Sequence, residues 1–337
     1  MMKIGVIGAG SWGTTLANVL AKKGYDVTLW VYEQDLAARL SETRINDLYL
    51  DGITLSPNLS YTNNLAGAVQ DRQVLVLVSP SQVMRSVLKQ LKPYLADDCL
   101  LVSAAKGIEN DTLLTMSEVL QEILGKDVKQ RSAFLSGPSF AKEVAAEQPT
   151  AVAVAGDDIE VTCRVQELFS TDYFRVYTNQ DVVGIEIGGA LKNVIALAAG
   201  VADGLGFSHN ARAALITRGL AEITRLGVAL GAQEATFLGL AGMGDLVLTC
   251  TGDLSRNRSV GIELGRGRKL DEILNQMRMV AEGVKTTLSA YQLATKLGVA
   301  MPITEQMYQI IYEDKDPRQA VAELMGRALS SEDESTL

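Results

Sequence analysis

The sequence has little of the chemistry on which metal and disulfide proteins depend. Its 337 residues include three cysteines and one histidine. Cys99, Cys163 and Cys250 lie far apart, with no CxxC motif or Cys/His cluster. A zinc site and a disulfide framework are therefore both unexpected. Carboxylates could still ligate a metal, but nothing in their pattern points to one, and we expect none.

The sequence is also short of positive charge and of long uncharged runs. Its net charge of −9 argues against a surface for nucleic acid or anionic membranes. A bound anion must then be held by a few local cations and backbone N–H groups. The most apolar stretch, 182–206, contains Glu186, Lys192 and Asp203, so its uncharged pieces fall short of the ~20 residues of a membrane span. A strand-like run begins at Lys3, which leaves no room for a signal peptide, and we expect a cytoplasmic protein.

What the sequence does contain is the composition of a folded chain, with 47% hydrophobic and 21% charged residues. Its length favours two domains. Up to about residue 180, short apolar runs alternate with helical patterns, as in parallel strands buried on both faces. This order predicts an α/β domain of Rossmann type with a doubly wound parallel sheet. Strands are expected at Ile4–Ile7, Val27–Val31, Val74–Val78, Leu100–Val102, Ala133–Leu135 and Ala151–Ala155.

The second half of the sequence predicts an all-α domain. Beyond Asp181, long helical patterns follow one another with little strand character. We place the first domain at 1–180, the helical domain at 181–330 and a frayed acidic tail at 331–337. Helices are expected at Val182–Ala202, Ala211–Leu230, Val284–Leu297 and Pro317–Leu329.

A glycine-rich hexapeptide follows the first predicted strand and opens a predicted helix. It reads Gly8-Ala9-Gly10-Ser11-Trp12-Gly13 and fits G-x-G-x-x-G. The first glycine permits a tight turn, the second lets the backbone approach a pyrophosphate, and the third allows close helix–strand packing. In this β-α-β setting the motif predicts dinucleotide binding. A purely structural glycine turn is the alternative.

The end of the second predicted strand bears on the choice between NAD and NADP. A carboxylate there favours the free ribose 2′-hydroxyl, and an arginine favours the 2′-phosphate. The chain reads Trp30-Val31-Tyr32-Glu33, with no adjacent arginine. Glu33 lies ~25 residues after Gly8, slightly beyond the expected spacing. A solvated glutamate after a strand explains it equally well, so NADH and NADPH both stay open.

Two further segments follow strands of the predicted sheet. Lys106 comes after Leu100–Val102, and Ser136-Gly137-Pro138-Ser139 comes after Ala133–Leu135. Ligands of doubly wound sheets bind outside the carboxyl ends of the strands. Lys106, Gly137 and Ser139 are therefore candidates for contact with substrate or cofactor. A surface turn is the alternative for each.

Lys192 is the most informative single residue because it lies within a strongly apolar helix. Gly188, Gly189 and Ala196 flank it by about one turn, and such small neighbours would let a ligand approach. A buried ammonium is costly without a partner or a purpose. Desolvation lowers its pKa and makes it a proton donor or acceptor near neutrality. A lysine snorkelling at a helix surface is the alternative.

A polar, glycine-rich stretch of the second half supplies a candidate anion site. It contains Gly242-Met243-Gly244-Asp245 and Ser255-Arg256-Asn257-Arg258. Ser, Arg and Asn together can cradle a phosphate, and an exposed basic loop is the alternative. The single histidine, His209, lies at a loop or helix start, where capping or surface exposure is expected. The absence of GxSxG and P-loop signatures disfavours hydrolases and kinases.

Taken together, these motifs point to one family. In chain order they are Gly8–Gly13, Ala105–Gly107, Leu135–Ala141, Gly189–Asn193, Gly239–Leu246 and Ser255–Arg258. In this order, and over most of its length, the chain resembles the NAD(P)-dependent glycerol-3-phosphate dehydrogenases. The resemblance is to the prokaryotic biosynthetic type, which supplies sn-glycerol 3-phosphate for phospholipid synthesis.

The resemblance implies reversible hydride transfer between NADH or NADPH and dihydroxyacetone phosphate, without a metal. It implies that Lys192 is the catalytic residue, which exchanges a proton with the substrate C2 oxygen, and that Lys106 contacts both cofactor and substrate. Implied substrate contacts are Gly137, Ser139, Lys192, Asn193, Asp245, Thr249, Ser255, Arg256 and Asn257. Implied cofactor contacts besides the glycine motif are Ser11, Trp12, Tyr32, Ala141, Arg256, Val280 and Glu282. Many relatives carry Arg or His where this chain has Tyr32, which puts a strict NADPH preference in doubt.

Two alternatives stay open at this point. A β-hydroxyacid dehydrogenase of the 3-hydroxyisobutyrate or 6-phosphogluconate type also pairs a Rossmann domain with a helical domain and a lysine. A dinucleotide sensor without catalysis would use the same fold, although it need not retain Lys106, Lys192 and Asp245. We expect a phosphorylated triose as partner, no nucleic acid, no integral membrane association, and a homodimer formed through the apolar helical half.

Overall fold

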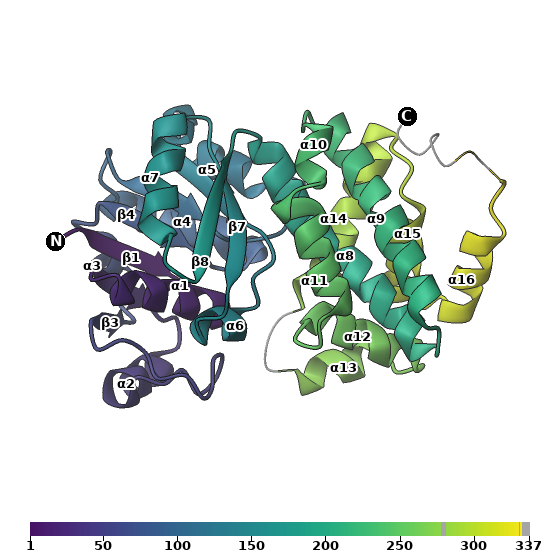
Figure 1. Ribbon diagram of the computed structural model, residues 1–337, viewed down its shortest axis with the longest axis horizontal. Helices are drawn as coiled ribbons and strands as arrows, with labels where there is room; N and C mark the ends of the chain where they lie inside the picture. The colour runs from purple at the N-terminus through teal and green to yellow at the C-terminus, as the bar shows by residue number, and fades with distance from the viewer. Residues whose placement is uncertain (278–280, 330, 332–337) are drawn as a thin grey trace. The chain divides into compact units, whose positions relative to one another are not determined.

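The computed structural model describes residues 1–277, 281–329 and 331 (Figure 1). Within them the chain divides into two compact units. The first contains Met1–Ala105 and Met116–Val182, and the second contains Lys106–Thr115 and Val183–Leu337. A short segment from the middle of the α/β half therefore belongs to the helical unit. Val280 and the predicted tail beyond Ser331 lie outside the described residues.

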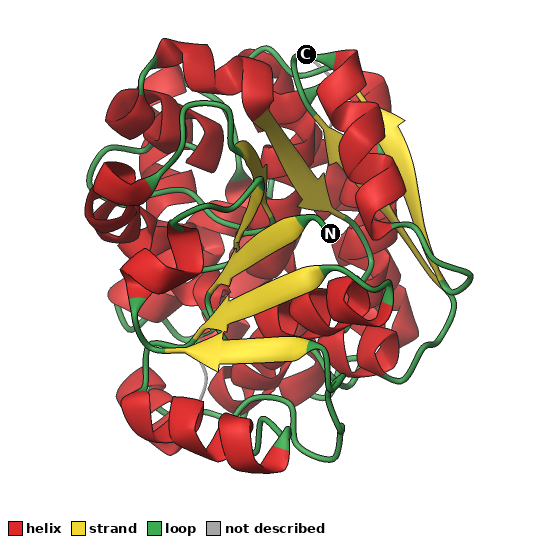
Figure 2. Cartoon of the chain, turned by 90° about the vertical axis from the view of Figure 1, so that its left-hand side faces the viewer, coloured by secondary structure: helices red, strands yellow, loops and turns green. Residues whose placement is uncertain are grey.

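The first unit is built on one eight-stranded sheet, shown in yellow in Figure 2, whose order is β3-β2-β1-β4-β5-β6-β7-β8. The chain winds outward from β1 to β3 and then returns to continue from β4 on the other side of β1, which makes the sheet doubly wound. All six predicted strands are confirmed. They are β1 Lys3–Ile7, β2 Asp26–Trp30, β4 Val74–Leu77, β5 Leu100–Ser103, β6 Ser132–Ser136 and β7 Thr150–Ala155.

Two edge strands complete the sheet, β3 Leu59–Thr62 and β8 Phe174–Asn179. The prediction of a parallel sheet is wrong for one pair, because β6 and β7 run antiparallel. Only a short helix, α6 Ala141–Ala145, lies between them. At 1.5 Å per residue it spans about 7.5 Å, too little to carry the chain back along the sheet. The chain therefore turns and pairs in the opposite direction.

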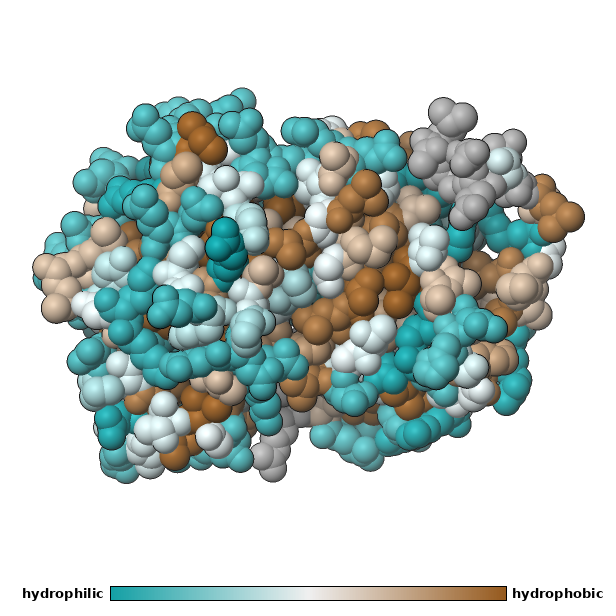
Figure 3. All heavy atoms as spheres, viewed as in Figure 1, coloured by the Kyte–Doolittle hydropathy of each residue, from teal (hydrophilic) through white to brown (hydrophobic). Residues whose placement is uncertain are grey.

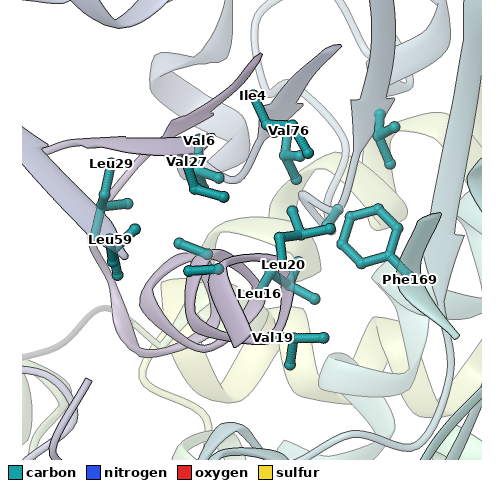
Figure 4. Packing of buried hydrophobic residues seen from close by; sticks show 14 of the residues in the cluster. Ile4, Val6, Leu16, Val19, Leu20, Val27, Leu29, Leu59, Val76 and Phe169 are labelled. Carbon is teal, nitrogen blue, oxygen red and sulfur yellow. The ribbon is translucent and has the colours of Figure 1, made fainter. Parts of the chain in front are cut away.

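Helices cover the sheet and bury its apolar faces. Leu16 and Leu20 of α1 (Ser11–Lys22) pack against Val6, Val27 and Val76 of the strands, as Figure 4 shows. These side chains are fully buried, so the hydrophobic effect fixes α1 on the sheet. The remaining elements are α2 Gln34–Thr43, α3 Leu65–Val69, α4 Ser81–Leu91, η1 Lys92–Tyr94, α5 Met116–Leu124, η2 Lys126–Arg131 and α7 Ile159–Phe169.

The second unit is helical in its described residues. Its central helix, α8 (Val182–Gly204), is long and apolar enough to cross a membrane, but 83% of its most apolar window is buried in the structure. That is the pattern of a core helix. The other elements are α9 His209–Ala229, α10 Glu234–Phe237, the short π-helix η3 Leu240–Gly244, α11 Asp245–Thr251, α12 Arg256–Gly265, α13 Leu270–Gln276, α14 Glu282–Leu297, α15 Pro302–Tyr312 and α16 Pro317–Met325.

Glycines let α8 and α12 approach closely. A Cβ on Gly200 would lie 2.1 Å from the carbonyl oxygen of Arg258, and one on Gly204 would lie 2.2 Å from that of Ile262. On α12, a Cβ at Gly261 would lie 2.1 Å from the Leu197 oxygen. Glycines four residues apart share a helix face, so backbone packs against backbone here. This contact fixes the start of α12 relative to α8.

Candidate active site

Lys192 lies on α8 with only 7% of its surface exposed. Its ammonium donates a hydrogen bond to Oδ1 of Asp245 and another, of 3.0 Å, to Oγ1 of Thr249. The other carboxylate oxygen of Asp245 accepts from Lys106 Nζ at 2.7 Å. All four residues belong to the second unit, since Lys106 begins its inserted segment. One buried carboxylate thus joins two lysines that are far apart in sequence.

Local structure explains how this cluster is held. Asp245 and Thr249 lie one turn apart on α11, and Thr249 Oγ1 donates to the Asp245 carbonyl at 2.6 Å. The short π-helix η3 before α11 packs closely, because a Cβ on Gly242 would lie 2.1 Å from the Phe237 carbonyl oxygen. Single turns of π-helix recur at functional sites. The side chains of α11 are therefore positioned by tight backbone packing.

Gly188, one of the three small residues beside Lys192, has a different role from the one predicted. A Cβ on Gly188 would lie 2.5 Å from the carbonyl oxygen of Ala241. The backbone of η3, and not a ligand, fills the space at Gly188. The lack of a side chain at Gly188 lets α8 pack against η3, which directly precedes Asp245.

Burial and the two lysines set the charges of the cluster. Burial, opposed by the charge of Asp245, lowers the pKa of Lys192 to about 8. Burial alone would raise the pKa of Asp245, but the charges of Lys106 and Lys192 outweigh it and the pKa lies below its usual value. Asp245 is therefore ionised at neutral pH. Lys192 can gain or lose a proton close to neutral pH.

A second set of hydrogen bonds orders the neighbouring helix starts. Asn257 donates from Nδ2 to Oδ1 of Asn193 at 2.9 Å and accepts from the backbone N–H of Gly283 at 3.0 Å. Both ends of the Asn257 amide are thus used to join α8, α12 and α14. Glu282 is the first residue of α14. Ser255 caps α12, because its Oγ accepts from the Arg258 N–H at 3.3 Å.

The two arginines of the predicted phosphate cradle differ. Arg258 binds Asp203 at 2.8 Å and Asp253 at 3.0 Å, so its charge is already neutralised. Arg256 is exposed and forms no ion pair with the described residues. It is also the first residue of α12, where the backbone N–H groups favour an anion. Of the two, Arg256 is the one available to a ligand.

In the first unit, the glycine motif has the geometry of a dinucleotide loop. Gly8 has a φ of 120°, which only glycine adopts readily. A Cβ on Gly13 would lie 1.9 Å from the Gly8 carbonyl oxygen, whereas a Cβ on Gly10 would meet nothing within 4 Å. The first and third glycines therefore close the turn, and the second leaves it open. These residues fit the pyrophosphate of a dinucleotide.

The residues that follow open α1. Ser11 is the first residue of the helix. The indole of Trp12 packs near Phe174, with ring centroids 6.3 Å apart, and its buried Nε1 has no hydrogen-bond partner among the described residues. An indole N–H without a partner is a donor that a bound ligand can satisfy.

The other predicted contacts of the first unit lie after β6 and β2. Gly137 has a φ of 143° and a Cβ there would lie 2.9 Å from Val152 Cα. Ser139 Oγ donates to the Gly137 carbonyl at 2.9 Å, and the Ala141 carbonyl accepts from Thr15 of α1 at 3.1 Å. Tyr32 is 77% exposed after β2.

Two residues near the glycine loop escaped the sequence analysis. Asn46 is fully buried and donates from Nδ2 to the carbonyl oxygen of Ala9 at 2.8 Å. Tyr49 donates from its hydroxyl to Glu33 at 2.7 Å. No local pattern marks either, because their role depends on a loop that folds back on the glycine motif. His209, by contrast, is exposed at the first position of α9.

Comparison with known proteins places the chain in a family. It matches NAD-dependent glycerol-3-phosphate dehydrogenase N-terminus over residues 3–162 and the corresponding C-terminus over residues 181–322. A glycerol-3-phosphate dehydrogenase (NAD(P)+) of Syntrophotalea carbinolica is 66% identical over 98% of this chain and 99% of its own length. That of Geobacter metallireducens is 66% identical over 96% of this chain and 97% of its own.

A solved structure agrees. The crystal structure of glycerol-3-phosphate dehydrogenase from Coxiella burnetii covers 97% of this chain and 99% of its own, with 40% identity and a TM-score of 0.93. Its similarity extends over the Rossmann-like part and the helical part alike. The chain therefore belongs to the NAD(P)-dependent glycerol-3-phosphate dehydrogenases, oxidoreductases that reduce dihydroxyacetone phosphate to glycerol 3-phosphate.

Proposed function

We propose that Lys192 is the proton donor and acceptor of this reaction. The observation that carries the proposal is a buried ammonium whose pKa lies at about 8 and whose position is fixed by Asp245 and Thr249. A general acid works best when its pKa lies near the working pH. Lys192 meets this condition, and its partners hold it without neutralising it by proton transfer.

The chemistry assigns a task to each group. When bound, the reduced nicotinamide supplies the hydride that C2 of dihydroxyacetone phosphate accepts. Negative charge then develops on the C2 oxygen, where the Lys192 ammonium stabilises it and delivers a proton. Asp245 keeps the ammonium charged and oriented. In the oxidation of glycerol 3-phosphate, neutral Lys192 takes the proton back.

We further propose that Arg256 binds the substrate phosphate. Its guanidinium is exposed without an ion pair among the described residues and lies at the N-terminus of α12. A phosphate held away from the reacting carbon supplies binding energy that orients C2. The paired Arg258 and the doubly bonded Asn257 keep the start of α12 in place. The substrate contacts implied for Gly137 and Ser139 stay predictions, as do the cofactor contacts implied for Val280 and Glu282.

For the first unit we propose a cofactor-binding role, with the loop Gly8–Gly13 at the pyrophosphate. Its support is the open space at Gly10 and the indole N–H of Trp12, which has no hydrogen-bond partner within the part of the chain that the structure describes. The second unit would then be the substrate and catalytic domain, since it contains Lys106, Lys192 and Asp245.

The test is the substitution Lys192→Ala. Turnover of dihydroxyacetone phosphate should nearly vanish, while the dissociation constant of NADH, measured by fluorescence titration, should change little. Lys285→Ala is the matched control, because Lys285 is an exposed lysine of the same unit on α14. An active Lys192→Ala enzyme would overturn the assignment. Comparing the triose phosphate with 3-hydroxyisobutyrate and 6-phosphogluconate tests the substrate class.

We also propose a homodimer that forms through α9, α10 and α11. Val228 on α9, Leu238 directly after α10 and Val247 on α11 are 48%, 70% and 39% exposed. Figure 3 shows hydrophobic residues gathered over the second unit where Figure 1 places α9 and α11. Exposed apolar patches mark protein interfaces. Leu238→Glu should give monomers in sedimentation velocity, and Leu329→Glu should not. A wild-type monomer at micromolar concentration would refute this.

Finally, we propose a cytoplasmic enzyme whose product feeds glycerophospholipid synthesis. Three free cysteines and the buried position of α8 are in keeping with this location. Depletion of the enzyme in its host should stop growth and added glycerol 3-phosphate or glycerol should restore it. Growth without either supplement would contradict the pathway assignment.

A further inference from the structure

The end of β2 lies directly beside the glycine loop. Ile7 of β1 pairs with Trp30 of β2, and the Gly8 N–H donates to the Trp30 carbonyl at 3.3 Å. In Rossmann folds this end of β2 is adjacent to the adenosine ribose. Tyr32 and Glu33 therefore lie where a Rossmann fold recognises the substituent at the ribose 2′ position.

Glu33 is held at this point by a continuous chain of hydrogen bonds. Its Oε1 accepts from the Tyr49 hydroxyl at 2.7 Å. The Tyr49 N–H donates to Asn46 Oδ1 at 3.0 Å, and Asn46 Nδ2 donates to the Ala9 carbonyl of the glycine loop at 2.8 Å. Asn46 is fully buried. This carboxylate is thus tied to the loop and is not a freely solvated side chain.

Within the described segment 31–64, the only cations are Arg39 and Arg44. Arg39 binds Asp35 at 2.8 Å and Asp47 at 3.0 Å, so two carboxylates neutralise it. Arg44 is the C-cap residue of α2, about 15 Å along the helix axis from Glu33. A 2′-phosphate would carry about two negative charges into surroundings that are already acidic.

We propose that Glu33 makes this enzyme select NADH over NADPH. The carboxylate accepts a hydrogen bond from the free ribose 2′-hydroxyl and repels a 2′-phosphate. Tyr49 is a positioning residue, because it holds the Glu33 carboxylate. The inference rests on the proposed binding of the dinucleotide by Gly8–Gly13. It adds the cofactor preference, which the sequence left open.

The test compares dissociation constants of NADH and NADPH, measured by fluorescence titration without substrate. Wild type should bind NADH at least ten times more tightly. Glu33→Gln keeps a hydrogen-bonding oxygen but removes the charge, so the NADH/NADPH ratio should narrow about ten-fold, mainly through tighter NADPH. Glu42→Gln, an exposed glutamate on α2, is the matched control and should leave the ratio unchanged.

Two more measurements separate charge from fold. Raising the salt concentration from ~20 mM to ~500 mM screens the repulsion between Glu33 and the 2′-phosphate. The difference between NADH and NADPH affinity should therefore narrow in wild type but not in Glu33→Gln. Tyr49→Phe should give an intermediate ratio. Equal or tighter NADPH binding by wild type, or an unchanged ratio in Glu33→Gln, overturns the role of Glu33. The loop assignment is tested separately with Gly10→Val. If this variant folds but binds neither dinucleotide while wild type binds them, the loop assignment stands. If wild type itself binds neither dinucleotide, the loop assignment is refuted.

Discussion

The proposed sites of the two units are built by opposite means. The glycine loop of the first unit uses backbone geometry, with Gly8 at a φ of 120° and Gly13 against the Gly8 carbonyl. The cluster of the second unit uses charge: Asp245 is only 1% exposed and lies between Lys106 and Lys192. The loop is local in sequence, and the cluster is assembled from three distant segments.

This difference predicts how each site fails. At Gly13 the loop fails by steric overlap when a Cβ is added, because backbone already occupies that space, and at Gly10 a Cβ would fill the space left for the ligand. A buried charge cluster fails when one partner is removed, because the remaining charges are left without compensation in a poorly solvated place. Shape changes should therefore affect the first unit and charge changes the second.

The largest effect is expected for Asp245→Asn. The substitution keeps the shape but leaves two ammonium groups facing each other, so the pKa of Lys192 should fall further. We expect kcat/KM to drop about a thousand-fold, or ~4 kcal/mol. Initial rates with dihydroxyacetone phosphate measure this.

A second carboxylate provides the matched control. Asp203 also binds two cations, Arg212 at 2.6 Å and Arg258 at 2.8 Å. Asp203→Asn should lower the melting temperature without a thousand-fold loss in kcat/KM. If Asp245→Asn stayed within ten-fold of wild type, the cluster would be structural and not catalytic.

The next largest effect is expected in the glycine loop. Gly13→Ala places a Cβ 1.9 Å from the Gly8 oxygen, so we expect a loss of about 1–3 kcal/mol in unfolding free energy together with weaker NADH binding. Gly10→Ala meets no atom within 4 Å and should weaken NADH binding at least ten-fold with an unchanged melting temperature. Titration and thermal unfolding separate the two. Wild-type NADH affinity in Gly10→Ala would mean that the open space is not the pyrophosphate site.

The fold could be predicted where the sequence pattern is strong. Continuous apolar runs located six strands, since both faces of those strands are buried. The edge strands β3 and β8 carry polar residues on one face and escaped notice, although Phe174 and Val176 alternate with exposed residues in β8. The last helix, α16, ends at Met325 and not at Leu329 as predicted. Leu329 is fully exposed, so burial does not stabilise a longer helix.

The site was predictable only in part, for a related reason. The glycine motif and Lys192 can each be recognised from the local sequence. The glycine motif is marked by its spacing, and Lys192 is marked by its apolar neighbours. That Lys106, Lys192 and Asp245 share hydrogen bonds depends on how α8, α11 and an inserted segment pack. Tyr49 and Asn46 gave no signal, because an ordinary polar residue becomes functional only through the loop that places it.

A smaller, graded effect is expected from pH. Because Lys192 titrates at about 8, the acid form needed for ketone reduction is present below that pH and is lost above it. The reduction rate constant kcat/KM should therefore fall by up to ten-fold per pH unit above about 8. Glycerol 3-phosphate oxidation should rise with pH over the same range. NADH affinity should stay flat, since the glycine loop has no titrating group. If the rates of ketone reduction and of glycerol 3-phosphate oxidation both rose, or both fell, with pH, Lys192 would be excluded as the acid.

The smallest effect concerns Glu222 on α9, where a buried carboxyl group is held by backbone N–H groups. It is 1% exposed and accepts from the backbone N–H groups of Ile303 and Thr304, at 2.6 and 3.1 Å, at the start of α15. Burial, partly offset by these hydrogen bonds, raises its pKa to about 7. The folded chain then binds a proton more tightly than the unfolded one, whose pKa is near 4.5. Stability from this group is fully present below pH ~4.5 and is lost as pH rises to ~7.

Glu222→Gln removes that titration, because an amide does not ionise. Between pH 5 and 8 the unfolding free energy of wild type should fall by about 1–2 kcal/mol more than that of the variant, as urea titrations at the two pH values can show. Glu305→Gln, an exposed residue on α15 itself, should follow wild type. If the Glu222→Gln curve also followed wild type, the carboxyl would be ionised throughout, held by the backbone N–H groups at the start of α15 and by the charge of Arg225. Backbone donors would then do, in the second unit, much of what the lysines do at Asp245.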